Sequence, residues 1–204
     1  IQPLWAVYAG HFARPGADPS GPPPAALAAA RALVGHGRIA ASAAAVALGP
    51  GMALSLNGIA QGYVTDRIAD LLRNEGYDRA MVQLGETRAL GTAPDGGPFR
   101  IGIGDPLSPG RIGREVELAE ASLAVSGGYG LRFGAGMHHI FDPATGRSPE
   151  MFLDTAVTAP RATLADALST ALYVAGPLAG HQLLRAFPEA RAQATRPDGR
   201  LADL

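Results

Sequence analysis

One segment, LSLNGIAQGY at residues 54–63, constrains the fold more than any other stretch of the chain. An apolar, β-like approach runs into a short turn around Gly58 and then directly into an amphipathic helix over 63–75. Apolar residues at i, i+4, i+7 and i+8 predict one buried face of this helix, and Gly76 ends it. These apolar residues are Val64, Ile68, Leu71 and Leu72.

A turn of this kind leaves backbone N–H groups at the start of the helix aimed at one point, with the positive end of the helix dipole behind them. The segment around Gly58 can therefore bind phosphate. A second interpretation stays open, because many turns between a strand and a helix use glycine only for tight backbone geometry.

Composition limits the class of protein. A chain of 204 residues with 47% hydrophobic residues can bury a sizeable core as a single domain over 1–204. The net charge of −1 gives no electrostatic case for binding nucleic acid or anionic lipid. The absence of cysteine excludes disulfides, thiolate metal sites and cysteine nucleophiles. No run approaches the roughly 18 apolar residues of a membrane span.

The remaining elements follow from periodicity and from glycine and proline positions. Helices are expected at 1–12, 25–34, 162–174 and 178–186, with a loop at 15–24. Strands are expected at 80–84, 99–103, 115–118, 122–125, 138–141 and 155–158, with hairpins at 39–56 around Gly49-Pro50-Gly51 and across Pro197-Asp198-Gly199. Strands and helices are interspersed without strict βαβ alternation, so the sequence predicts an α+β fold with mixed sheets and packed helices.

A predicted helix near the end of the chain carries a carboxylate and a hydroxyl on one face. Asp166 and Thr170 are one turn apart, about 40° from each other around the axis, with leucines on the opposite face. Two stacked oxygens can supply hard ligands to Mg²⁺ and leave other positions to water and phosphate oxygens. An ordinary surface face, with a first-turn acid favoured by the helix dipole, explains the pattern as well.

Other polar positions also allow two interpretations. His138 and His139 are neighbours in a predicted strand, so their rings point to opposite faces and at most one faces a given site. A histidine there can act as a general base on a hydroxyl, or it can be a solvated edge-strand residue. Glu86 follows the predicted strand 80–84, where it either contacts a ligand or lies in solvent. The turn SGGYG at 126–130 either admits a planar ligand or reverses the chain.

Taken together and in this order, the pieces resemble the FAD:protein FMN transferases, the ApbE family. The run LSLNGIAQGYVTDRIADLL is followed by MVQLGE, FRIGIGDP, LAVSGGYG, HHIFDPATGRS, AVTAP and ADALSTALYV. Seven elements in the family's order over residues 54–174 make the match specific, whereas each element alone is weak.

The resemblance implies a T-fold-like flavin transferase with FAD as substrate and Mg²⁺ as cofactor. Members transfer FMN from FAD to a Thr or Ser hydroxyl of an acceptor flavoprotein and release AMP. The implied metal ligands are Asp166, Thr170 and the backbone carbonyl of Gly58. The implied base that activates the acceptor hydroxyl is His139. The implied FAD contacts are Ser55, Gln61, Glu86 and Ile140.

Two positions depart from the usual pattern, since many members have Asp where this chain has Ser55 and Lys where it has Gln61. The form Asn-Gly-Ile-Ala-Gln-Gly is a variant within the family.

Two other functions stay open. One is Mg²⁺-dependent hydrolysis of FAD to FMN and AMP, with water in place of the protein hydroxyl. The other is a non-catalytic flavin-binding maturation factor, which the neutral pair favours and the retained Asp166, Thr170 and His139 oppose.

The resemblance also implies a segment upstream of this chain. Ile1 is not a natural initiator, so we expect the chain to begin inside a longer product whose N-terminal third carries an export signal, a lipoprotein cysteine and some flavin contacts. The implied location is the periplasm, anchored to the inner membrane. We expect residues 1–204 alone to bind FAD poorly, because a pocket loses affinity steeply when one wall is missing.

Overall fold

A computed structural model describes residues 1–134 and 136–204, and their contacts divide the chain into two compact units. Unit 1 comprises Ile1–Ser55 and Gly128–Glu150, and unit 2 comprises Leu56–Gly127 and Met151–Leu204. The single domain over 1–204 stays a prediction. Among the described residues, no helix has the length and apolar character needed to cross a membrane.

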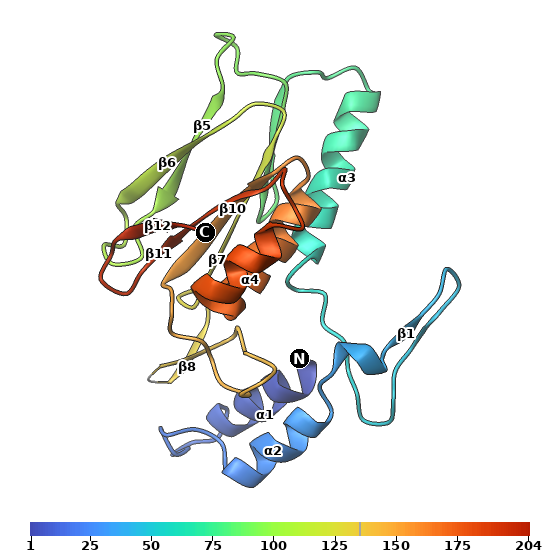
Figure 1. Ribbon diagram of the computed structural model, residues 1–204, viewed down its shortest axis with the longest axis vertical. Helices are drawn as coiled ribbons and strands as arrows, with labels where there is room; N and C mark the ends of the chain where they lie inside the picture. Colours follow the sequence, from blue (N-terminus) through green and yellow to red (C-terminus); the bar gives the residue numbers. More distant parts are fainter. Residues whose placement is uncertain (135) are drawn as a thin grey trace. The chain divides into compact units, whose positions relative to one another are not determined.

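Unit 1 is built from short helices and two small hairpins (Figure 1). Its core joins the first helix to the segment near Phe141, whose ring centroid lies 4.7 Å from that of Tyr8. The two helices confirm the predictions at 1–12 and 25–34 to within two residues. The elements are α1 (Gln2–Phe12), α2 (Pro24–Ala32), the 3-10 turn η1 (His36–Arg38), β1 (Ala40–Ala41), β2 (Val46–Ala47), β8 (Arg132–Gly134) and β9 (Met137–His138).

The predicted hairpin at 39–56 is shorter than expected and turns elsewhere. The chain reverses between Ser42 and Ala45, where the Ser42 N–H donates to the Ala45 carbonyl at 2.9 Å. The Ser42 hydroxyl stabilises this turn, because it accepts N–H bonds from within it. Gly49-Pro50-Gly51 forms a separate turn closed by Met52. The approach at 53–56, predicted to be β-like, is not part of a strand.

The predicted strand at 138–141 is wrong beyond its first residue. β9 ends at His138, whose backbone N–H donates to the Ser148 hydroxyl at 2.9 Å instead of extending a strand ladder. His139 donates its backbone N–H to the Leu131 carbonyl at 3.0 Å. The HHIF segment therefore follows an irregular path held by side-chain and loop bonds.

Unit 2 contains a six-stranded sheet in the order β12-β11-β10-β7-β4-β3, with antiparallel pairing throughout. The strands β5 and β6 pair with each other as a separate two-stranded hairpin. The predicted strands other than the one at 138–141 are found here, together with β4, which was not predicted. The bounds are β3 (Ala80–Gln83), β4 (Thr87–Leu90), β5 (Phe99–Gly104), β6 (Ile112–Leu118), β7 (Ser122–Gly127), β10 (Asp154–Ala159), β11 (Arg191–Thr195) and β12 (Leu201–Asp203).

The helices α3 (Ala60–Asn74) and α4 (Ala162–Leu184) cover one face of this sheet, and the β5–β6 hairpin covers the other (Figure 1). Alternating strand residues separate the two cores. Ala124 and Val157 pack in one cluster with Leu172 of α4, whereas their neighbours Leu123 and Ala156 pack with the hairpin. The predicted α+β class with several sheets and packed helices is confirmed.

Glycines end or break the helices of unit 2 where the sequence predicts. Gly76, with φ of 90°, follows α3, and the next residue, Tyr77, donates its N–H to Leu72 at 3.0 Å. Gly176, with φ of 70°, interrupts α4 immediately before Pro177, in agreement with two predicted helices at 162–174 and 178–186. A tight turn at 197–199 joins β11 to β12.

The buried face of α3 is largely not the predicted one. Val64, Ile68 and Leu71 are 37% to 53% exposed, whereas the fourth predicted residue, Leu72, is partly buried and packs against a core cluster. The residues that α3 buries are instead Gly62, Thr65, Asp66 and Ala69. Small residues on this face allow close approach to α4, and the packing of two backbones outweighs the apolar periodicity.

The two helices are in tight contact at Gly62. A Cβ atom placed there would lie 2.3 Å from the carbonyl oxygen of Ala162 and 2.8 Å from Cβ of Asp166. Real Cβ atoms essentially never come this close to other atoms, so the backbone of α3 rests directly on the first turn of α4.

Gly62→Ala should therefore destabilise the protein, because α3 must move away from α4 to admit the methyl group. We expect the free energy of unfolding to fall by about 1–3 kcal/mol in urea denaturation. Gly10→Ala is the matched control, since Gly10 also lies inside a helix and its Cβ position has nothing within 4 Å. A Gly62→Ala variant as stable as wild type would contradict the close approach.

Candidate active site

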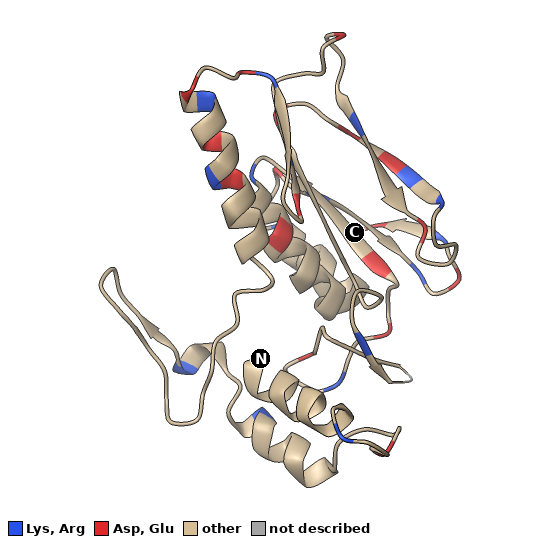
Figure 2. Ribbon diagram, turned by 180° about the vertical axis from the view of Figure 1, so that it is seen from behind, with Lys and Arg blue, Asp and Glu red and all other residues tan. Residues whose placement is uncertain are grey.

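The first turn of α3 is capped by a residue of another helix. Its own N-cap residue, Ile59, makes no side-chain cap bond, and the Gly62 N–H donates instead to Oδ2 of Asp166 at 2.9 Å. Asp166 lies one turn into α4 and is the sole acidic residue of that helix, visible as its red band in Figure 2. It is only 3% exposed, so the interpretation of its helix face as an ordinary surface is wrong.

Within unit 2, the structure brings the three predicted metal-binding residues together. Thr170 follows Asp166 by one turn of α4, as the sequence predicts. A Cβ atom on Gly58 would lie 3.3 Å from Oγ1 of Thr170, so the backbone of the Gly58 turn packs against that hydroxyl. The Thr170 hydroxyl also lies 3.0 Å from Oγ of Ser126 at the end of β7.

Two buried carboxylates, those of Asp166 and Glu86, interact electrostatically in this region. Burial raises the pKa of Asp166, and the hydrogen bond from Gly62 opposes that rise. Burial, with the Asp166 charge as a second cause, raises the pKa of Glu86 to about 8, against a bond from the Val125 backbone. Among the described residues, Asp166 forms no ion pair. The site therefore holds negative charge that the protein itself does not compensate.

Gln61 lies beside this carboxylate pair. Gly85, with φ of +97°, precedes Glu86, and a Cβ atom on it would lie 2.6 Å from the side-chain amide nitrogen of Gln61. The left-handed backbone of Gly85 turns the chain at the end of β3, and its missing side chain leaves room for the amide. Three predicted site positions, Gln61, Glu86 and Asp166, thus belong to one region of unit 2.

The prediction that the N–H groups at the start of α3 are free to bind a ligand is wrong for three of them. The N–H groups of Ile59 and Ala60 both donate to the carbonyl of Leu56, at 3.0 and 2.8 Å, and that of Gly62 is bound by Asp166. The backbone geometry of the turn, together with its role beside Thr170, accounts for these glycines better than a phosphate cradle made of these N–H groups.

The two adjacent histidines have different environments in unit 1. His138 is buried, with Nε2 donating to the Pro149 carbonyl at 3.0 Å and Nδ1 accepting from the Ile140 N–H at 3.3 Å. Burial lowers the pKa of His138. His139 is half-buried, and its Nδ1 lies 3.3 Å from the Leu131 carbonyl. A carbonyl only accepts, so Nδ1 of His139 carries the proton and Nε2 carries the lone pair of a base.

The predicted residues are thus divided between the units. His139, Ile140 and Ser55 belong to unit 1, with Ser55 as the last residue before the boundary. Ile140 is buried and its N–H donates to His138, so its backbone carbonyl and side chain are the groups that remain to contact a ligand. The remaining five predicted residues, Gly58, Gln61, Glu86, Asp166 and Thr170, belong to unit 2.

Sequence reasoning missed several polar side chains of unit 2. Ser126 bonds the hydroxyls of both Ser169 and Thr170, at 2.8 and 3.0 Å. Its signal is its place at the end of a strand, next to a glycine turn. Asp66 accepts bonds from the first turn of α4. No periodicity indicates Asp66, because acidic helix residues usually face solvent.

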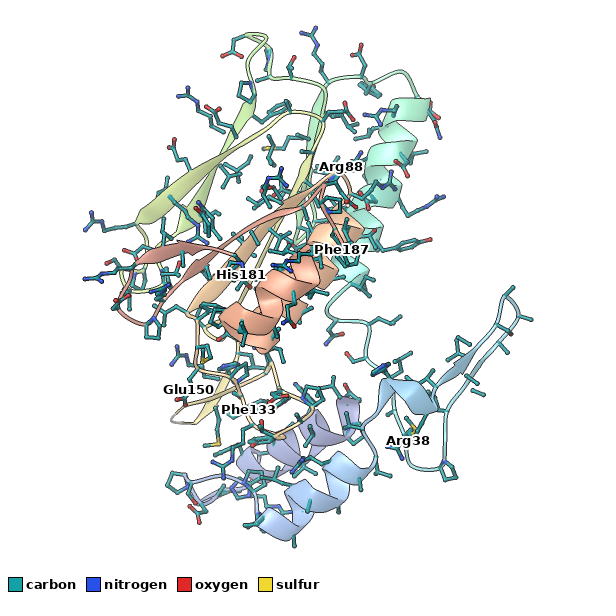
Figure 3. All side chains as sticks on the ribbon, in the orientation of Figure 1. Arg38, Arg88, Phe133, Glu150, His181 and Phe187 are labelled. Atoms are coloured by element: carbon teal, nitrogen blue, oxygen red, sulfur yellow. The ribbon has the colours of Figure 1, made fainter. Side chains whose placement is uncertain are left out.

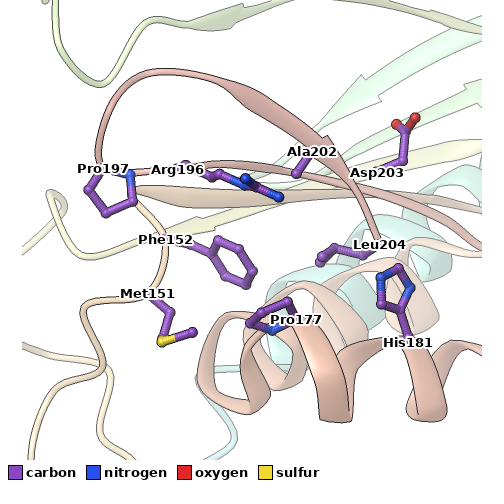
Figure 4. A pocket seen from close by; sticks show the side chains of 9 residues that line it. All are labelled: Met151, Phe152, Pro177, His181, Arg196, Pro197, Ala202, Asp203 and Leu204. Atoms are coloured by element: carbon purple, nitrogen blue, oxygen red, sulfur yellow. The ribbon is translucent and has the colours of Figure 1, made fainter.

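A cavity of about 250 Å³ lies elsewhere in unit 2, between the last turns of α4 and the β11–β12 hairpin (Figure 4). None of the predicted site residues lines it. Its walls combine apolar residues with charges of both signs, including Phe152, Pro177, Leu204, His181, Arg196 and Asp203. The cavity is separate from the carboxylate pair.

The donors around Asp166 suit a hard divalent cation. They comprise one carboxylate, the Thr170 hydroxyl and the adjacent Gly58 backbone, all oxygen ligands of the kind that Mg²⁺ prefers. The described residues contain no group of three or more His, Asp or Glu placed for a metal. A cation here would therefore be held by fewer than three carboxylate or histidine side chains of the described residues and would keep positions for water or phosphate oxygens.

Comparisons with known proteins point to one family. A sequence profile of the ApbE family matches residues 1–194. The FAD:protein FMN transferase of Treponema pallidum is 37% identical over 165 residues, which cover 74% of this chain and 46% of that protein. The enzyme of the same name from Escherichia coli K12 is 31% identical over 142 residues, covering 67% and 40%. The chain spans less than half the length of these curated relatives.

Solved structures show the same similarity. The flavin transferase ApbE from Vibrio cholerae matches with a TM-score of 0.78 and 28% identity, covering 99% of this chain and 66% of that chain. The ApbE protein from Thermotoga maritima matches with a TM-score of 0.79 and 27% identity, covering 89% and 62%. The fold is therefore similar to that of flavin transferases, as the resemblance implies.

The raised pKa of Glu86 predicts a stability that falls as pH rises. The unfolded chain releases this proton near the ordinary value of 4.5, whereas the folded chain keeps it until about pH 8. Between these values the folded state binds more protons, so the free energy of unfolding decreases with rising pH. Glu86→Gln cannot ionise and should flatten this decrease. Melting temperatures of the two proteins, measured without divalent metal, should diverge most at alkaline pH, and parallel curves would contradict the shift.

Proposed function

The chain belongs to the ApbE family, and we propose that it acts as an FAD:protein FMN transferase. In this proposal, FMN passes from FAD to a Thr or Ser hydroxyl of an acceptor flavoprotein, AMP is released, and Mg²⁺ is required. The observation that carries the proposal is the meeting of Gly58, Asp166 and Thr170 at a buried, uncompensated carboxylate.

Among the described residues, no cationic side chain forms an ion pair with the carboxylate of Asp166. Asp166 has one oxygen bound by the Gly62 N–H, and its charge is otherwise uncompensated among the described residues. When bound, Mg²⁺ would neutralise charge on the pyrophosphate oxygens of FAD. Because burial makes the lone carboxylate costly, a bound cation would also relieve the cost of keeping Asp166 ionised.

The proposed chemistry follows from a pyrophosphate substrate. The acceptor oxygen attacks the FMN-side phosphorus, a new P–O bond forms there, and the P–O bond to AMP breaks. His139 is the proposed base that takes the proton of the acceptor hydroxyl, since its Nε2 carries a lone pair while Nδ1 donates to Leu131. Gln61 and Glu86, beside the metal ligands, are proposed FAD contacts, as are Ser55 and Ile140.

We also propose a periplasmic location with an upstream lipid anchor at the inner membrane. This proposal rests on the resemblance of the chain to the family. Fractionation of cells that produce the whole gene product would place it in the membrane fraction facing the periplasm. Recovery in the cytosol would contradict this location.

One assay separates the proposed transferase from its two alternatives. The protein is mixed with FAD, Mg²⁺ and a candidate acceptor, and both AMP release and the mass of the acceptor are followed. Transfer requires that AMP appears with an acceptor mass increased by FMN, and that an acceptor whose target hydroxyl residue is changed to Ala stays unmodified. AMP released equally without acceptor would indicate a hydrolase, and FAD bound without AMP would indicate a non-catalytic flavin-binding protein.

Asp166→Ala should abolish AMP release and leave the fold largely intact, because the metal site loses its one carboxylate. Asp166→Asn is the informative control: it keeps an oxygen for the Gly62 N–H but loses the charge. We expect both variants to be inactive, with the melting temperature of Asp166→Asn closer to wild type. An Asp166→Ala variant that releases AMP at the wild-type rate without excess Mg²⁺ would remove Asp166 from the metal site.

His139→Ala should slow FMN transfer by about 10²–10⁴-fold, the usual contribution of a general base. FAD binding should fall much less. His138→Ala should leave the rate per folded molecule close to wild type, although its bonds to Pro149 and Ile140 contribute to stability. Single-turnover transfer rates and melting temperatures of both variants check this. The reverse order of effects on the rate would show that His138 is the base.

A further inference from the structure

Asp66 is a buried acid that the proposed chemistry does not use. It lies on α3, is 1% exposed, and its carboxylate accepts backbone N–H bonds from Ala162 and Thr163, both at 2.9 Å. It also accepts from the Thr163 hydroxyl at 2.6 Å. These donors form the first turn of α4, whose own N-cap residue, Arg161, makes no side-chain cap bond. Asp66 therefore caps α4 from outside.

Two arginines surround the same carboxylate. Arg161 lies 3.3 Å away through Nε, and Arg88 lies 3.4 Å away through Nη1. Arg88, labelled in Figure 3 beside the start of α4, is buried and also donates to the Pro160 carbonyl immediately upstream of that helix. Asp66 thus has both its charge and its lone pairs satisfied, which excludes it as a metal ligand.

The two aspartates form a closed arrangement between the helices. Asp66 of α3 binds the start of α4, and Asp166 of α4 binds the Gly62 N–H at the start of α3. The two positions correspond along the helices. Asp66 lies four residues after Gly62 on α3, and Asp166 lies four residues after Ala162 on α4. Gly62 and Ala162 are themselves in tight contact. A shift of α4 along α3 would break both sets of bonds.

We propose that Asp66 is a positioning residue for the metal site. By holding the first turn of α4 on α3, it fixes where Asp166 and Thr170 stand relative to the Gly58 turn, which leads into α3. This role rests on the proposed function, because it assumes that Asp166 and Thr170 bind Mg²⁺. Its effect is on metal affinity rather than on the chemistry of the acceptor.

The test is the affinity of the whole chain for Mn²⁺, followed by electron paramagnetic resonance as a substitute for Mg²⁺. Asp66→Asn keeps the volume of the side chain but loses its charge and one acceptor oxygen. The matched control is Asp70→Asn, one turn further along α3. Asp70 also pairs with Arg161, through two bonds of 2.8 Å, but within the described part of the chain it accepts no bond from Ala162 or Thr163.

We expect Asp66→Asn to weaken Mn²⁺ binding about tenfold or more, as is common when the partners that orient metal ligands are changed. Asp70→Asn should bind Mn²⁺ as wild type does. Val116→Ala, in the β5–β6 hairpin, separates lost stability from lost positioning, because it should lower the melting temperature and leave Mn²⁺ affinity unchanged. Thr163→Val, which removes only the hydroxyl donor, provides a milder second variant if Asp66→Asn fails to fold, with a smaller loss of affinity expected.

Three results would overturn the proposal in distinguishable ways. If Asp166→Ala loses Mn²⁺ while Asp66→Asn and Thr163→Val bind it like wild type, the metal site stands and the positioning role is wrong. If Asp166→Ala itself binds Mn²⁺ like wild type, the proposed metal site is wrong, and the role of Asp66 falls with it. An equal loss in Val116→Ala and Asp66→Asn would show that stability alone governs the affinity.

Discussion

The mutual capping of α3 and α4, by Asp166 and Asp66, is the interaction on which the rest of unit 2 depends. Neither helix has a side-chain cap of its own, and each receives one from the other. Unpaired N–H groups at a buried helix start cost free energy, so the two helices are more stable together than apart. Gly62 permits the contact, because any larger residue would collide with the carbonyl of Ala162.

The two aspartates differ in how their charge is balanced. Asp66 has two arginines and three hydrogen-bond donors around it. Among the described residues, Asp166 accepts one backbone N–H bond, and Glu86 adds a second acid to its surroundings. Burying an unpaired carboxylate is costly, and a fold retains such a group where a cation or a substrate compensates it. Both aspartates thus cap a helix. Asp66 only supports the helices, whereas Asp166 is also available to bind a ligand.

Local signals in the sequence predicted much of unit 2. The glycine at 76 predicted where α3 ends, the two helices predicted at 162–174 and 178–186 agree with the break at Gly176, and the one-turn spacing predicted that Asp166 and Thr170 share a face. These features depend on residues close in the chain, which is why they could be read without a structure. The prediction that His138 and His139 point to opposite faces rested on a strand at 138–141, and that strand ends at His138.

Features that depend on distant contacts could not be predicted. The apolar period of α3 indicated Val64, Ile68 and Leu71 as the buried face, whereas the contact with α4 selects the small residues and Asp66. No local pattern shows that an acid on one helix caps another helix about a hundred residues away. The burial of Asp166 is of the same kind, since the sequence allowed a surface face equally well.

The central claim is that the crossing of α3 and α4 builds the metal site. A crystal of the protein soaked in Mn²⁺, with data collected for anomalous scattering, tests it most directly. The account predicts one strong anomalous peak in contact with the Asp166 carboxylate and the Thr170 hydroxyl, beside the backbone of Gly58. A peak at other residues, with these oxygens uncoordinated, would contradict it.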